Sequence, residues 1–116
     1  MANLIKATLV AVSMLCAAAG AQAAELVMVD MKACSYCAKF RHDVAPTYDS
    51  TAAGQMAPLR KVSPLKKWPA DLAGVRPAPY TPVFILVDNG REIGRFAGYT
   101  NAQAFWAKLN PLLASL

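Results

Sequence analysis

Apolar residues follow two different spacings in the first half of the chain. Residues 25–31 (ELVMVDM) are short, β-branched and mostly apolar, which is typical of a strand. From Cys34 onward the spacing becomes helical, and the apolar positions are Cys37, Phe40, Val44 and Tyr48. The pattern predicts a strand, the short connection Lys32-Ala33, and a helix that begins near Cys34. Because Pro46 interrupts helical hydrogen bonding, we expect this helix to bend or end near Ala45.

Prolines interrupt the middle of the chain. Seven of the eight prolines lie between Pro46 and Pro82, which argues against a long regular helix there. Residues 58–63 (PLRKVS) predict a short strand, and residues 70–74 predict at most one helical turn. The sequence does not predict which elements the rest of this region forms.

The last third carries a clear hairpin pattern. Residues 83–87 (VFILV) are continuously apolar, as expected for a strand buried on both faces. Asp88-Asn89-Gly90 predicts a tight turn, since Asn and Gly tolerate the positive φ angles that such turns need. Residues 92–97 (EIGRFA) alternate polar and apolar positions and predict the returning strand.

A final helix is predicted after the hairpin. Thr100 and Gln103 fit a capping box at its start. Pro111 is expected to bend or shorten it. Its apolar face comprises Phe105, Leu109, Leu112, Leu113 and Leu116.

This order of elements predicts an α/β fold. A strand, a crossover helix and a second strand form a right-handed parallel unit. The later hairpin adds antiparallel strands to the same sheet, so we expect a central mixed β-sheet flanked by helices.

The amino terminus reads as an export signal. Lys6 precedes an apolar run at residues 7–19, and Ala21-Gln22-Ala23 resembles a cleavage site. The run is shorter than the roughly 20 residues that span a bilayer core of about 30 Å, so an uncleaved membrane anchor is the weaker reading. Leu15 stands before Cys16 where a lipoprotein signal has a small residue, which argues against a lipid anchor. We therefore expect residues 1–23 to be a signal peptide and residues 24–116 to be one domain.

The charge of the mature chain is modestly positive. Loss of Lys6 leaves 11 of the 12 basic side chains against 7 acidic ones, a net charge of +4. The charge is spread along the chain and not gathered in a block. This pattern allows a mild attraction to acidic partners and gives no support for nucleic-acid binding.

Cys34 and Cys37 are the two cysteines that remain after cleavage, and export would place them where disulfides persist. A disulfide between them closes too short a loop to stabilise the fold much. On a helix their side chains share one face at a separation compatible with a disulfide. The helix N-terminus lowers the pKa of the Cys34 thiol below its usual value of about 8.5. We expect Cys34 to be the nucleophile and Cys37, more buried, to resolve the mixed disulfide.

Zinc binding is the main chemical alternative for this pair. Structural zinc takes four ligands, and the mature chain offers only Cys34, Cys37 and His42, so an Asp would have to complete the set. We therefore predict no metal and no cofactor, and we interpret His42 as a surface residue. Phe105, Trp68 and Trp106 are most simply packing residues.

The strand-to-helix placement of Cys34-Ser35-Tyr36-Cys37 resembles the active site of the thioredoxin-fold family. The resemblance covers residues 25–116 and implies a thioredoxin fold with the CxxC at the N-terminus of the first helix. It also implies a cis bond at Thr81-Pro82, which the sequence alone would not predict. The exposed backbone at Thr81 would then pair with an extended substrate segment.

A closer resemblance is to the periplasmic SoxS-type thioredoxins of sulfur-oxidation systems. It rests on ELVMVDMKACSYCAKF, on PLRKV with WPADLAGVRP, and on YTPVFILVDNGREIGRFAGY. It implies reduction of disulfides in sulfur-oxidation proteins, with a membrane thiol transporter as electron donor. Ala33 replaces the Trp of ordinary thioredoxins, and Ser35-Tyr36 replaces their Gly-Pro, so no reduction potential is carried over. Asp30 is either the buried proton acceptor of thioredoxins or an exposed structural residue.

The leading prediction is a periplasmic thiol–disulfide oxidoreductase that reduces partner proteins, without a stable membrane anchor. Two alternatives remain open. One is a disulfide oxidant or isomerase, which a measured reduction potential would distinguish. The other is a metal- or partner-binding module that uses Cys34 and Cys37 as ligands.

Overall fold

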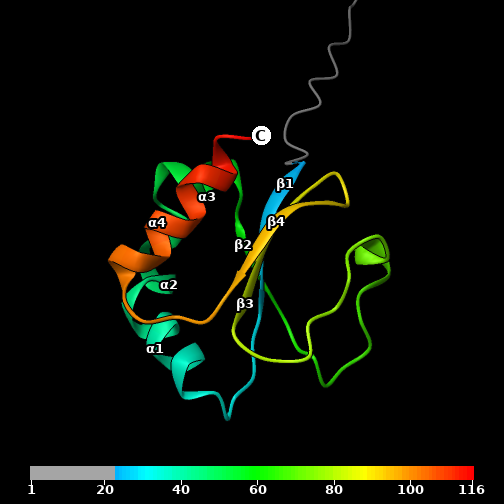
Figure 1. Ribbon diagram of the computed structural model, residues 1–116, viewed down its shortest axis with the longest axis horizontal. Coiled ribbons are helices and arrows are strands. Elements are labelled where there is room, and N and C mark those ends of the chain that lie inside the picture. The colour runs from blue at the N-terminus through cyan, green and yellow to red at the C-terminus, as the bar shows by residue number, and fades with distance from the viewer. Residues whose placement is uncertain (1–22) are drawn as a thin grey trace, which may run out of the picture.

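A mixed β-sheet of four strands forms the centre of the computed structural model, which describes residues 23–116 (Figure 1). The strands lie in the order β2-β1-β3-β4. Their bounds are β1 Ala24–Val29, β2 Leu59–Val62, β3 Val83–Asp88 and β4 Arg91–Ala97. Apart from Ala23, the predicted signal segment lies outside the described residues.

The pairing directions confirm the predicted α/β class. Strand β1 runs parallel to β2, with Val29 opposite Val62. It runs antiparallel to β3, with the same Val29 opposite Val83. Strand β3 pairs antiparallel with β4 across the predicted turn. Asn89 and Gly90 have φ angles of 54° and 77°, the left-handed geometry that the hairpin requires.

Helices cover one side of the sheet, and an irregular segment covers the other (Figure 1). Among the described residues, no helix is both long and apolar enough to cross a bilayer. The α-helices are α1 Ser35–Asp43, α2 Ala45–Tyr48, α3 Ala52–Met56 and α4 Ala102–Leu113, and the 3-10 turn η1 is Ala70–Leu72.

The alternation of strand side chains divides the core between these two sides. Towards the helices, Leu26, Met28 and Phe84 pack with buried residues of the helical layer, which are Cys37, Phe40, Val44 (in the turn after α1), Tyr48, Phe105 and Leu109. The intervening strand residues face the irregular segment and pack with Leu72 and Val75. These strand residues are Val27, Val29, Val83 and Ile85. Burial of β3 on both faces is confirmed.

The aromatic residues that we expected to pack do so. Phe105 and Trp106 belong to the core on the helical side. Trp68 packs against the opposite core, and its indole Nε1 donates to the carbonyl oxygens of Leu72 and Val75 at 2.9 and 3.0 Å. These bonds hold the irregular segment against the sheet.

Helix α3 is absent from the sequence-based prediction. Its start is fixed locally by Thr51, whose Oγ1 accepts the Gly54 N–H at 3.0 Å. The end of the helix is held by the Tyr48 hydroxyl, which donates to the carbonyl of the C-cap residue Ala57 at 2.8 Å. Gly54 approaches the backbone of Tyr48 and Asp49 so closely that a Cβ would overlap it. A helix of five residues leaves too little periodicity to be recognised in sequence.

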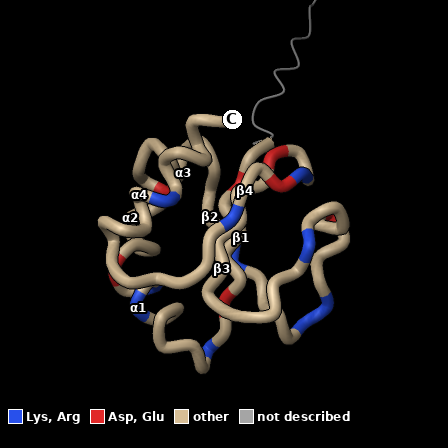
Figure 2. The backbone as a smooth tube through the Cα atoms, in the orientation of Figure 1, with Lys and Arg blue, Asp and Glu red and all other residues tan. Residues whose placement is uncertain are grey.

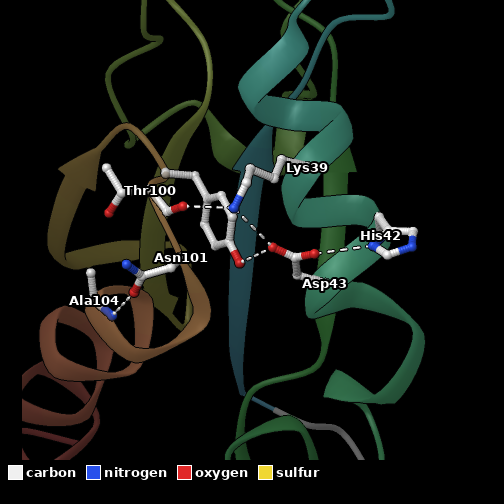
Figure 3. Close-up of polar contacts among 7 residues, drawn as sticks. Lys39, His42, Asp43, Thr100, Asn101 and Ala104 are labelled. Carbon is white, nitrogen blue, oxygen red and sulfur yellow. Dashed lines mark hydrogen bonds and ion pairs between the residues drawn. The ribbon is translucent and has the colours of Figure 1, made fainter.

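The predicted capping box at Thr100 is wrong by one residue. Asn101 is the N-cap of α4, and its Oδ1 accepts the Ala104 N–H at 2.8 Å (Figure 3). The carbonyl of Thr100 instead accepts a hydrogen bond from Lys39 Nζ at 2.9 Å. Pro111 does not end the helix, which continues to Leu113.

Candidate active site

Cys34 is placed at the start of α1 by a tight turn that follows β1. Its N–H donates to the carbonyl of Met31 at 3.2 Å, which closes the turn. Cys34 itself keeps extended backbone angles, φ −93° and ψ 110°, and is the N-cap of the helix. The sequence-based start of the helix near Cys34 is confirmed.

The N-cap position brings a backbone N–H to the Cys34 sulfur. Cys34 Sγ accepts from the Cys37 N–H at 3.1 Å, as a capping oxygen does in other helices. The two residues are joined in a disulfide, with 5.2 Å between their Cα atoms. After reduction the same N–H and the helix dipole would face the negative charge of a Cys34 thiolate.

The two cysteines differ in burial. Cys34 is half-buried, whereas Cys37 is fully buried and belongs to the core on the helical side. A substrate therefore reaches Cys34 first. Burial in apolar surroundings favours the neutral thiol of Cys37.

Thr81 and Pro82 lie just before β3, at the end of the two central strands where the CxxC turn follows β1. The bond between them is cis, which confirms the expectation from the family resemblance. Because Val83 pairs with Val29, the antiparallel register places Pro82 beside Asp30. Pro82 is buried, and its carbonyl accepts the Gly98 N–H at 2.8 Å.

Asp30 makes an ion pair that the sequence did not reveal. Its carboxylate contacts Arg41 of α1, and its own N–H donates to the Val62 carbonyl at 2.9 Å. Its side chain is only 12% exposed, so the reading as an exposed residue is wrong. The pair links the end of β1 to α1 on either side of the CxxC turn. No local pattern joins two residues on different elements, so sequence reasoning missed Arg41.

A second polar cluster fastens α1 to the segment before α4 (Figure 3). The carboxylate of Asp43 accepts from Tyr99 Oη at 2.9 Å, contacts His42 Nδ1 at 3.0 Å and pairs with Lys39 Nζ at 3.4 Å. The hydrogen bonds from His42 and Tyr99 lower the pKa of the Asp43 carboxyl. Burial, helped by Asp43, raises the pKa of Tyr99 to about 12.

This cluster is structural. Its hydrogen bonds connect Asp43, at the end of α1, to Tyr99, and Lys39, in the middle of α1, to the Thr100 carbonyl. The side chain of His42 is 89% exposed, which confirms its interpretation as a surface residue. Within residues 23–116, no group of three or more His, Cys, Asp or Glu side chains is arranged to hold a metal ion.

Comparisons with known proteins agree with this geometry. Residues 13–112 match the family model of the thioredoxin-like domain. The structure is similar to the reduced form of the periplasmic thioredoxin SoxS from Paracoccus pantotrophus, with 33% sequence identity and a TM-score of 0.74. The similarity covers 78% of this chain and 96% of that one. No curated protein matches the sequence.

Proposed function

The chain belongs to the thioredoxin-like family and is a thiol–disulfide oxidoreductase, and from this premise we propose that it reduces disulfides of partner proteins in the periplasm. The observation that carries the proposal is the placement of Cys34. Cys34 is half-buried and its sulfur caps a helix, while Cys37 is fully buried beside it.

The reaction follows from this asymmetry. In the reduced protein, the Cys34 thiolate attacks one sulfur of a substrate disulfide, whose S–S bond breaks and releases one substrate thiolate. Cys37 then loses its proton and attacks Cys34 Sγ in the mixed disulfide. The second substrate thiolate leaves, and the Cys34–Cys37 disulfide is formed. Two electrons pass to the substrate in each cycle.

Thr81 and Pro82 are proposed to bind the substrate segment. The register of β1 and β3 supports this role, because it brings Pro82 to the same end of the sheet as the CxxC turn. Thr81 is half-buried and precedes the first residue of β3. Its backbone would pair with an extended segment on either side of the substrate cysteine.

The periplasmic location rests on two kinds of support. Residues 1–23 have the composition of an export signal, and SoxS of Paracoccus pantotrophus is a periplasmic thioredoxin. A reductant in an oxidising compartment needs electrons from elsewhere, which we assign to a membrane thiol transporter. We propose sulfur-oxidation proteins as the partners.

The direction of electron flow is testable by redox equilibrium with glutathione. Known relatives span about −270 mV for reductants to about −120 mV for oxidants. We expect the Cys34–Cys37 couple to lie near the reducing end. A value near the oxidising end would favour a disulfide oxidant or isomerase instead.

Replacement of Cys37 with serine should trap partner proteins. The Cys34 thiolate can still attack, but no second thiol completes the exchange, so mixed disulfides accumulate. They are detected as thiol-sensitive adducts after electrophoresis and identified by mass spectrometry. The double variant C34S/C37S is the control and should trap nothing. If C37S captured no protein either, reduction of protein disulfides would be contradicted. A captured set without sulfur-metabolism proteins would count against that partner class only.

A further inference from the structure

A basic groove borders the turn that leads into Cys34. It has a volume of about 640 Å³ and lies between that turn, α1 and the loop after β2. A second hollow of about 390 Å³ adjoins it, and the two share Asp30, Ser63 and Lys66. We call the two adjoining hollows together the basic groove. Its side chains include Met31, Lys32, Ala33, Arg41, Arg60, Lys61, Leu65 and Lys67.

Within residues 23–116, only two of the six cations that line the basic groove form salt bridges. Asp30 is its only acidic side chain and is paired with Arg41. Arg60 is paired with Glu25 and Asp71. Among residues 23–116 the remaining cations of the groove form no salt bridge; these are Lys32, Lys61, Lys66 and Lys67.

Basic positions recur along the loop that follows β2 and stands apart from the helical layer (Figure 2). The groove also has an apolar part. Leu65 is 81% exposed, and Met31 and Ala33 line the same hollow. A surface of this kind suits a ligand that combines negative charge with an apolar side chain.

We propose that the basic groove binds an acidic segment of the substrate protein, close in sequence to the disulfide that Cys34 attacks. The inference rests on the proposed function, because a segment bound in the basic groove assists the reaction only if Cys34 attacks substrate disulfides. Uncompensated lysines attract a polyanionic segment and raise its rate of encounter. Met31, Lys32 and Ala33 directly precede Cys34, so a segment held there keeps its cysteine near the reactive sulfur.

The test uses two synthetic peptides, each carrying one cysteine in a mixed disulfide with 2-mercaptoethanol. They differ only in their flanking residues, which are glutamates in one peptide and glutamines in the other. The measured quantity is the ratio of the second-order rate constants for their reduction by the reduced protein in a single turnover. We expect a ratio of about 5 in favour of the acidic peptide at low salt, since each exposed charge pair contributes only modestly. The ratio should approach 1 at about 1 M salt, where the Debye length is about 3 Å.

The variant K66E/K67E should remove or reverse the preference. Its matched control is R91E/K108E, which makes the same change in net charge at exposed cations on β4 and α4 that have no salt bridge within residues 23–116. The control should keep a reduced preference for the acidic peptide, well above that of K66E/K67E. Equal loss of the preference in both variants would show a general charge effect and contradict binding in the basic groove. Equal rates of reduction of the two peptides by the unmodified protein would also contradict it, while leaving the oxidoreductase activity supported. Failure to reduce either peptide would instead contradict the proposed function.

Discussion

Replacing Cys34 with serine is expected to abolish disulfide reduction. The serine hydroxyl can still cap α1, because an oxygen accepts the Cys37 N–H as readily as sulfur does. The fold should therefore survive, while the nucleophile is lost. Oxygen cannot take the place of sulfur in the mixed disulfide, and Cys37 is fully buried and does not substitute for Cys34.

The measurement is the rate at which the reduced protein cleaves a neutral aromatic disulfide, followed by absorbance. The C34S rate should equal the rate of the uncatalysed reaction. The matched control is H42A, which alters an exposed residue on the same helix and should leave the rate unchanged. Substantial activity in C34S would show that the reactive sulfur lies elsewhere.

Replacing Phe40 with alanine is expected to lower the free energy of unfolding by about 3–5 kcal/mol. Phe40 is fully buried, and its ring lies 4.8 Å from Phe84, 5.6 Å from Tyr99 and 5.0 Å from Phe105, measured between centroids. It joins α1 to the sheet and to α4, so its loss leaves a cavity where three elements meet. A small domain has few other contacts to compensate.

Urea denaturation of the oxidised protein measures this effect. The matched control is Y36A, which removes an aromatic ring four residues earlier on α1 that is 61% exposed. We expect a change of no more than about 0.5 kcal/mol there. A loss below about 1 kcal/mol in F40A would show that the helical core does not depend on this ring.

Features that depend on neighbouring residues were predictable from sequence. The apolar run of β3 and the Asn89-Gly90 turn specify the hairpin through local geometry. The strand-to-helix position of Cys34 and Cys37 could be read from the change of period between residues 31 and 34. The predicted strand 25–31 extended two residues too far, since regular pairing ends at Val29.

Features that depend on contacts between distant residues were not predictable. The Asp30–Arg41 pair forms because the fold returns α1 beside the end of β1. Asn101 caps α4 in place of Thr100, whose carbonyl is already bound by Lys39 from another helix. The cis bond at Thr81-Pro82 was expected only from the family resemblance, since most X–Pro bonds in folded proteins are trans.

The acidity of the Cys34 thiol tests the central claim most directly. The reduced protein is alkylated with iodoacetamide over a range of pH, and mass spectrometry assigns the rate to each cysteine. The N-cap position predicts that the pKa of the Cys34 thiol lies well below the value of about 8.5 for a free thiol, with Cys37 unreactive over that range. Two equally slow thiols with pKa values of about 8.5 or higher would contradict it.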